Sequence, residues 1–441
     1  MDRLEGFDFA RHNAEVRALW DAWNAGKPTR VPVIFGFNSR YFMNNPETNP
    51  QGLDFRAYSE DPDLMFDTLL GFVRWRQFNI LMDAELGLPE KWELWVDFQN
   101  YHEAAWLGCP IEYRDGQVPD TSPLFKDRPE KVMENGIPDP MGGLLARGLE
   151  YYEHFKERAS REEFLGRPIA IPPPFTGSDG VMTVACNLFG PEFVCTEMAR
   201  DPDRIRVLFG FINDCTVARM RAWRALTGVP VPQDGFWYAD DSIALISTRM
   251  YREHVLPHHR RVYAEFGTEK GRFIHLCGNA TRHFKTIQEE LGMEGFDTGY
   301  PVDFGRLRRE LGPRARIWGG PRVELLRAGT ESEVVEETRR ILRSGILDQG
   351  GLFVLREGNN LAPGTPHANL EAMYRTGIEE GRALSRPVEE GRALSRPVEE
   401  GRALSRPVEE GRALSRPVEE GRALSRPVEE GRALSRPVEE G

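Results

Sequence analysis

Short apolar runs alternate with longer amphipathic stretches along most of the chain. Runs of about five to eight residues rich in β-branched and aromatic side chains indicate strands, and apolar positions three and four residues apart indicate helices. The strand-like runs cover residues 31–37, 78–83, 167–174, 235–240, 272–277, 295–299, 315–320 and 351–357. Between them, the clearest helical patterns span 202–226, 247–267 and 331–346. Asp201 is placed as an N-cap, and Thr330 with Glu333 has the spacing of a capping box.

This alternation predicts an α/β fold with a parallel sheet, namely a (β/α)8 barrel of the TIM type with enlarged loops. A doubly wound open sheet is the alternative, but no glycine-rich dinucleotide fingerprint follows the first strand. The longest insertion follows the second strand, from residue 84 to about 166. It either covers the mouth of the barrel or forms a surface excursion with a small core of its own.

The end of the sequence is a perfect repeat. From Gly381 the decapeptide GRALSRPVEE occurs six times, and the last residue is Gly441. Each copy contains two Arg and two Glu, so the net charge of −12 belongs to residues 1–380. Three apolar residues in ten, with a proline in every copy, cannot bury enough surface to offset the entropy of ordering. We therefore expect a barrel over 1–380 and a disordered tail over 381–441.

Composition narrows the classes of partner. The negative charge and the absence of a basic cluster interleaved with aromatic residues disfavour nucleic acid. The sequence contains no apolar stretch long enough for a membrane span and no secretory signal pattern at its start, which favours the cytoplasm. Scattered cysteines at 109, 186, 195, 215 and 277 are expected to stay reduced. A small molecule or another protein is the expected partner, and a homodimer is compatible with the sequence.

Polar residues follow the predicted strands, where the active site of such a barrel is built. The residues at these positions are Asn38, Arg40, Asp83, Phe175, Tyr238, Asp240, Asp241, His275, Cys277, Asp297, Arg356, Glu357 and Asn359. In the run Phe-Ile-His-Leu-Cys, side chains two residues apart share a face, so His275 and Cys277 face the lumen if Ile274 and Leu276 face the helices. Such a pair can hold Zn²⁺ with one further ligand, or can be two ordinary core residues.

Several ordered motifs resemble the uroporphyrinogen decarboxylase superfamily. They are RVPVIFGFNSRYF and NILMDAELGLP near the start, ADDSIALISTRMYREHVLPHHRRV in the middle, and HLCGNATRHF, GFDTGYPVDFGRLRRELGPRARIWGGP, LLRAGTESEVVEETRRIL and NNLAPGTPHANLEAMYRTG towards the end. The resemblance covers most of residues 28–380. It implies a (β/α)8 barrel and is compatible with two activities, decarboxylation of a tetrapyrrole and zinc-dependent methyl transfer involving a corrinoid.

For a decarboxylase, the resemblance implies an arginine-rich first loop and an aspartate after the second strand. Arg40 matches one arginine of that loop, with Phe37 or Asn38 where another stands, and Asp83 matches the aspartate. Asp83 would contact the pyrrole NH groups and Arg40 would hold a carboxylate. Asp83 can also be a simple strand-end cap.

For a methyltransferase, the resemblance implies that His275 and Cys277 are zinc ligands. The family's third ligand, a cysteine after the last strand, is replaced by Asn359, so Glu357 is the candidate substitute unless it pairs with Arg356. In addition to Asp83, the catalytic candidates are Tyr238 and Asp241. The expected substrate-binding residues are Asn38, Arg40, Asp240, Arg356 and Asn359.

Three hypotheses follow. The first is a corrinoid-linked methyltransferase or demethylase with zinc as cofactor and a corrinoid, free or on a partner protein, as the methyl carrier. The second is decarboxylation of a porphyrinogen, which needs no metal. The third is a tetrapyrrole-binding scaffold without catalysis, which leaves inward-facing His, Cys, Asp and Glu groups unexplained.

Overall fold

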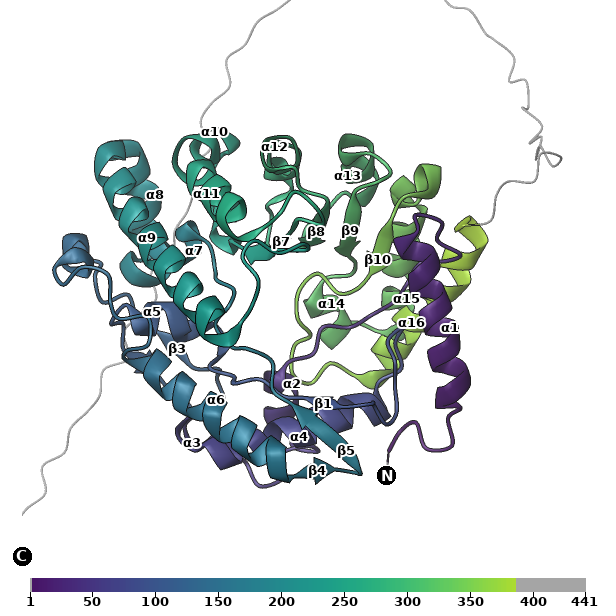
Figure 1. Cartoon of the computed structure of the whole chain (residues 1–441). Helices are drawn as coiled ribbons and strands as arrows, with labels where there is room; N and C mark the ends of the chain where they lie inside the picture. The colour runs from purple at the N-terminus through teal and green to yellow at the C-terminus, as the bar shows by residue number, and fades with distance from the viewer. Residues whose placement is uncertain (1, 386–441) are drawn as a thin grey trace, which may run out of the picture. The chain divides into compact units, whose positions relative to one another are not determined.

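Five parallel strands form the central sheet of the protein. The structure, a computed structural model, describes residues 2–385. The strands lie in the order β10, β9, β8, β7, β6, and the helices that connect them lie outside the sheet (Figure 1). Their bounds are β6 Trp237–Ala239, β7 Phe273–Leu276, β8 Gly295–Thr298, β9 Arg316–Gly319 and β10 Phe353–Leu355. The five predicted runs from 235 onwards therefore each contain a strand of one parallel sheet.

The first predicted strand is reduced to a single bridge and the second to a backbone hydrogen bond. Val33 pairs in parallel with Leu355 beside β10, and the Asp83 amide donates to the Val33 carbonyl at 2.7 Å. Pro32 has no N–H to donate, which limits regular pairing of this segment. The second run begins inside a helix, because α4 spans Pro62–Asn79. These segments extend the sheet, but the prediction of full strands there was wrong.

The third predicted strand does not belong to the barrel. β5, Arg167–Ala170, pairs in parallel with β1, Trp92–Glu93, and antiparallel with β4, Glu163–Phe164. Leu165 and Gly166, both with positive φ, make the tight turn between β4 and β5. Beyond β5, a run of three prolines ends the pairing. The barrel position beside β6 is taken instead by Asp179, which bridges Ala239.

The remaining elements cover the sheet or the segment after α4. The longer helices are α1 Phe9–Asn24, α6 Leu144–Arg161, α7 Val181–Phe189, α8 Pro191–Arg200, α9 Pro202–Thr227, α11 Leu256–Phe266, α12 Thr281–Leu291, α13 Phe304–Leu311, α15 Glu331–Ile341 and α16 His367–Ser385. The shorter elements are α2 Ser39–Met43, α3 Phe55–Glu60, α5 His102–Trp106, α10 Thr248–Met250, α14 Val323–Ala328, β2 Ile111–Glu112 and β3 Asp120–Thr121.

Two predicted helix starts are confirmed by their caps. The Asp201 carboxylate accepts a hydrogen bond from the Arg204 amide at 3.0 Å at the start of α9. Thr330 and Glu333 form the reciprocal capping box of α15. The predicted helix 247–267 is helical from α10 to α11, with a π-helical turn at Tyr251–Val255.

The long segment after α4 packs around apolar residues of its own. Trp92, Leu94, Phe98 and Phe155 belong to a buried cluster that also includes residues of α3 and α4. This cluster is separate from the main core, which lies between the central sheet and its helices. The segment also supplies residues to the cavity described below.

The last helix crosses the expected boundary between barrel and tail. α16 continues to Ser385, five residues into the first decapeptide, and Gly381 is buried against Val31. The rest of the repeat lies outside the described residues. Within residues 2–385, no helix combines the length and apolar content needed to cross a membrane.

Candidate active site

A cavity of about 630 Å³ opens at the carboxyl ends of the barrel strands. Most of the sequence-derived candidates line it, and they come from the start of α2, from β7 and β8, and from the segments after β6, β7 and β10. These residues are Asn38, Arg40, Asp241, His275, Cys277, Asp297, Arg356 and Asn359. The cavity therefore gathers residues that are more than three hundred positions apart in the sequence.

Three side chains at one wall of the cavity offer metal-ligating atoms to a common point. One such atom from each of Asp241, His275 and Cys277 lies within 4.8 Å of the others. Strand alternation puts two of them there, because Ile274 and Leu276 are fully buried towards the helices while His275 lines the cavity. Asp241 is fixed beside them, since its Oδ1 accepts the Cys277 amide at 2.7 Å and lies 3.7 Å from His275 Nε2.

His275 is held from its other side by Asp297. The Nδ1 atom lies 2.7 Å from Asp297 Oδ2, on the neighbouring strand at the same register position. Burial opposes the charged imidazolium, but the hydrogen bond and charge of Asp297, together with Asp241, outweigh it and raise the pKa of His275. The two carboxylates therefore favour a positive charge on His275.

The surroundings of the Cys277 thiol strongly disfavour its ionisation to the thiolate. Burial raises its pKa far above the usual value, and the nearby Asp241 carboxylate raises it further. The Asp241 carboxylate therefore contributes to the raised pKa of both His275 and Cys277. A divalent metal held by these side chains would favour the thiolate.

A second polar group faces the cavity from the segment after α4. Glu103 accepts the Asp179 amide at 3.1 Å and Arg219 Nη2 at 3.2 Å, and its Oε1 lies 3.1 Å from His102 Nε2. Burial opposes ionisation, yet His102 and Arg219 lower the pKa of Glu103 to about 2. Burial and the surrounding carboxylates, Glu103 first among them, raise the pKa of Asp179 well above its usual range.

These residues and Trp237 were missed by the sequence analysis. Trp237 lines the cavity with 52% of its surface exposed, and its ring lies 5.8 Å from that of His275. The strand alternation that picks out His275 also picks out Trp237, the residue paired with Phe273. Glu103 and Asp179 carried no such signal, because they precede or lie outside any regular barrel strand.

The residues at the mouth of the cavity are rich in amides. Arg40 donates from Nε to Gln99 at 2.6 Å and from Nη2 to Asn100 at 3.2 Å. Asn38 caps α2 by accepting the Arg40 amide at 3.1 Å, while Asn359 lies on the opposite loop. The guanidinium is therefore held in place by neutral partners at the rim.

Asp83 does not line this cavity. Its carboxylate is fully buried and bonded to Arg30 at 2.5 and 2.7 Å, to the Val33 amide at 2.7 Å and to the Tyr374 hydroxyl at 3.2 Å. All of these partners belong to the protein, so the geometry favours a structural role. The expectation that Asp83 contacts a substrate is not supported.

Two further candidates, Tyr238 and Asp240, also lie outside the cavity lining. Tyr238 points towards the helices, as strand alternation requires for the neighbour of Trp237, and packs near His259. Asp240 is fully buried and accepts the amides of Met182 and Thr183 at the start of α7, as well as His259 Nε2 at 2.8 Å. Neither is placed to bind a substrate.

Glu357 is not part of the metal-ligating group. It is fully buried, accepts the Gly36 amide at 2.9 Å and pairs with Arg356 at 2.9 Å. The structure therefore shows Glu357 in an ion pair with Arg356, which was the alternative to a role as a metal ligand. Asp241 takes the third position that the sequence analysis assigned to Glu357.

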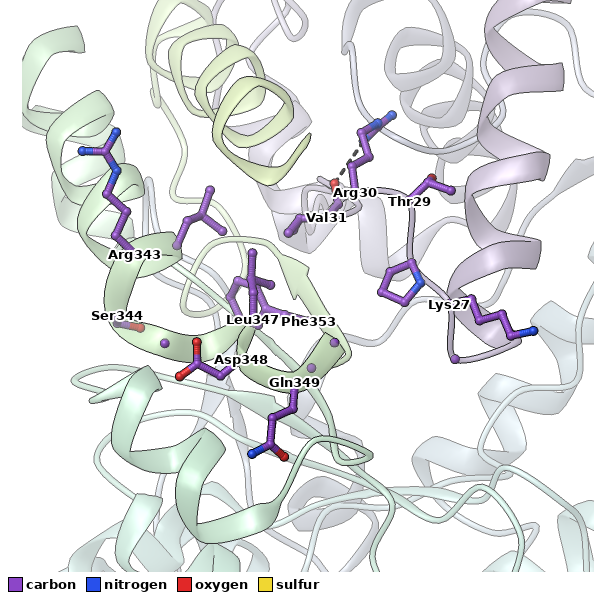
Figure 2. A pocket seen from close by; sticks show the side chains of 16 residues that line it. Lys27, Thr29, Arg30, Val31, Arg343, Ser344, Leu347, Asp348, Gln349 and Phe353 are labelled. Carbon is purple, nitrogen blue, oxygen red and sulfur yellow. Dashed lines mark hydrogen bonds between the residues drawn. The ribbon is translucent and has the colours of Figure 1, made fainter. Parts of the chain in front are cut away.

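A larger cavity, of about 990 Å³, lies at the opposite end of the barrel strands, before Val33 and at the start of β10 (Figure 2). Arg30 in its wall pairs with Asp83, and Arg343 pairs with Glu380. The 16 residues that line this cavity include no histidine or cysteine. The reactive side chains thus belong to the smaller cavity.

Comparison with known proteins places the chain in a family. The pattern of the family described as uroporphyrinogen decarboxylase (URO-D) matches residues 17–379, which is most of the sequence. The chain belongs to the uroporphyrinogen decarboxylase family. The resemblance seen in the sequence motifs is thereby confirmed.

Relatives within the uroporphyrinogen decarboxylase family carry both activities in their names. A methylated-thiol–coenzyme M methyltransferase from Methanosarcina mazei is 26% identical over 284 residues, covering 62% of this chain and 68% of the relative. A uroporphyrinogen decarboxylase from Rhodococcus opacus is 32% identical over 146 residues, covering 33% of this chain and 39% of the relative.

A solved structure supports the fold. A methyltransferase from Methanosarcina mazei superposes with a TM-score of 0.55 at 19% identity, covering 82% of this chain and 98% of the other. Together with the family assignment, this likeness identifies the fold as a TIM-type α/β barrel.

Proposed function

We propose that this protein is a zinc-dependent, corrinoid-linked methyltransferase or demethylase. The observation that carries the proposal is the convergence of Asp241, His275 and Cys277 within 4.8 Å at the carboxyl end of the barrel. A corrinoid, free or carried by a partner protein, would deliver or accept the methyl group. The substrate would be a small molecule.

The donor set fits zinc. One nitrogen, one sulfur and one carboxylate oxygen are ligand types that zinc accepts, and three protein ligands leave a fourth position open, as in catalytic sites. All three side chains are only partly exposed and line the cavity, so the fourth position is reachable from it.

The proposed reaction exchanges a methyl group between cobalt and a sulfur or oxygen atom. In the thiol-accepting direction, the carbon–cobalt bond breaks and a carbon–sulfur bond forms. The thiol loses its proton and cobalt keeps the bonding electron pair. Zinc, when bound, would lower the pKa of the incoming thiol and so raise its nucleophilicity.

The chain's own residues prepare this step. Asp297 orients His275, and Asp241 stays beside the pair through its bond to the Cys277 amide. Trp237 lines the same cavity, and its ring lies 5.8 Å from that of His275, which gives this wall an aromatic surface. Arg40 and Arg356 are cations on the cavity lining that a polar substrate would meet.

Decarboxylation of a tetrapyrrole has less support. That alternative assigned the central role to Asp83, whose carboxylate is buried and occupied by Arg30, Val33 and Tyr374. The methyltransferase relative also matches over a longer part of the chain than the decarboxylase relative, 284 against 146 residues.

The test combines metal content with methyl transfer. We expect about one zinc per chain in the full-length protein and loss of zinc in a Cys277→Ala variant. Cys195→Ala is the matched control, because Cys195 is partly exposed and does not line the cavity. Methylcobalamin with a thiol, and cob(I)alamin with a methyl thioether or methyl ether, serve as probes for the two directions. A wild-type protein without zinc, or an unchanged zinc content in Cys277→Ala, would contradict the proposal.

A further inference from the structure

Asp297 occupies a special position relative to the candidate metal ligands. It lies on β8, directly opposite His275 on β7, and both side chains point into the barrel. Only 4% of its side chain is exposed. Asp297 does not belong to the group of three metal-ligating side chains, and it contacts one of them from behind.

The contact decides which nitrogen of His275 is available. Asp297 Oδ2 lies 2.7 Å from Nδ1, and because a carboxylate can only accept, Nδ1 must carry the hydrogen. A neutral imidazole then presents its lone pair on Nε2, the atom that lies 3.7 Å from Asp241 Oδ1. The pairing therefore selects the tautomer that a metal at the cavity wall requires.

A chain of buried ion pairs holds Asp297 in this orientation. Arg356 Nη1 donates to the same Oδ2 atom at 2.9 Å, and Arg356 Nη2 donates to Glu357 at 2.9 Å. Glu357 in turn accepts the Gly36 amide at 2.9 Å. The series ties the Asp297 carboxylate to Arg356 and, through it, to Glu357 and the Gly36 backbone.

We propose that Asp297, fixed by Arg356 and Glu357, is a positioning residue that sets the tautomer and orientation of His275 for metal binding through Nε2. The proposal rests on the proposed function, because it presumes that His275 is a ligand. It also gives Glu357, which is not a ligand itself, a role in the same site.

A purely structural ion pair is the competing explanation. It predicts that loss of Asp297 lowers stability without changing the affinity of a folded protein for zinc. A positioning role predicts a loss of affinity, since carboxylates behind a metal-bound histidine typically contribute 10- to 100-fold. The two explanations therefore differ in metal affinity rather than in stability.

The experiment measures the zinc dissociation constant of the full-length protein by competition with a chromophoric chelator. We expect Asp297→Asn, which keeps an acceptor but loses the charge, to bind zinc about 10- to 100-fold more weakly than wild type. Asp234→Asn is the matched control, because Asp234 forms an exposed pair with Lys270 away from the cavity. Equal affinity of wild type and a folded Asp297→Asn would overturn the inference.

A second measurement does not depend on the variant folding. In a crystal structure of the zinc-loaded wild type, zinc should lie on His275 Nε2 with Nδ1 still bonded to Asp297. Zinc on Nδ1, or a His275 turned away from Asp297, would refute the positioning role. Wild type that binds no zinc at all would instead refute the proposed function, so the two failures are distinguishable.

Discussion

The Cys277 thiol lies next to a carboxylate that works against its ionisation. Removing that charge in Asp241→Asn should lower the pKa of the thiol, because Asp241 raises it in addition to burial. After treatment with a chelator, we expect Cys277 in this variant to react with iodoacetamide ~3- to 10-fold faster at pH 8 than in wild type, since only the thiolate reacts. Mass spectrometry of the modified peptide gives the rate.

The reactivity of Cys195 provides an internal control for this measurement. It lies in α8, outside the cavity, and should react at the same rate in both proteins. An Asp241→Asn variant with an unchanged Cys277 rate would show that burial alone sets the thiol pKa.

Asp83 should matter for stability rather than for the site. Asp83→Asn leaves the Arg30 guanidinium, only 11% exposed, without its charged partner. Breaking a buried pair from one side costs about 3–5 kcal/mol. We expect the free energy of unfolding in urea to fall by that order, with the zinc content of the folded protein unchanged. Loss of zinc without loss of stability would return Asp83 to the active site.

At the level of elements, Glu103 ties α5 to α9 through the buried Arg219. Glu103→Gln should lower the free energy of unfolding by about 3–5 kcal/mol at pH 7. A carboxyl group with a lowered folded-state pKa stabilises the protein above its unfolded-state pKa, and this contribution is lost as pH falls towards the folded-state value. Here the window runs from the ordinary 4.5 down to about 2.

The difference between wild type and Glu103→Gln should therefore be constant above pH 5 and shrink below about pH 4.5. Urea unfolding at pH 7 and pH 3.5 measures it. Glu130→Gln is the control, because Glu130 pairs with Arg204 on the surface and such pairs contribute ~0–1 kcal/mol. A difference that does not vary with pH would show that Glu103 is not ionised in the folded protein.

The end of β8 lies so close to the end of β7 that only glycine fits between them. A Cβ atom on Gly299 would overlap the backbone of Cys277 and Gly278. Gly299→Ala should push Cys277 out of line with His275 and weaken zinc binding at least tenfold. Gly210→Ala is the control, because a Cβ there would meet nothing and its φ, like that of Gly299, lies outside the left-handed region. Zinc affinity measured by chelator competition distinguishes the two.

At the scale of the whole molecule, the last helix sets the minimum length of a stable chain. Glu380 pairs with Arg339 and Arg343, and Gly381 packs on Val31. A chain ending at Ser385 should therefore unfold at the same temperature as the full-length protein. A chain ending at residue 379 should unfold at a lower temperature, by a few degrees. Equal melting temperatures for the two truncated chains would show that the part of α16 beyond residue 379 does not contribute to stability.

The sequence predicted the second half of the barrel better than the first. β6 to β10 each coincide with a buried apolar run followed by a helix, a pattern that local periodicity records. The segments at Val33 and Asp179 pair through single bridges, and β5 joined another sheet. Prolines and long-range pairing decide those outcomes, and neither appears in the alternation of apolar residues.

The candidate site shows the same contrast between features set by local sequence pattern and features set by long-range contacts. His275 and Cys277 lie where strand alternation predicts them, because parity is a local property. Glu357 and Asp240 were assigned to the cavity from their place after a strand, yet they accept hydrogen bonds from the amides of Gly36 and Thr183, which are distant in sequence. Which of two neighbouring acidic residues turns inward depends on such partners. Asp241 could therefore be recognised as the third member only in the folded protein.

One part of the cavity is built from regular strands of the barrel, and the other part is built from residues outside those strands. His275 and Asp297 lie on the paired strands β7 and β8 and Asp241 follows two residues after β6, whereas Arg40, Asn100 and Asp179 lie outside the strands of the central sheet. Strand pairing tolerates few insertions, but loops accept them readily. Changes in the wall outside the strands could thus alter the substrate, while the strand-borne wall keeps the candidate metal ligands in place.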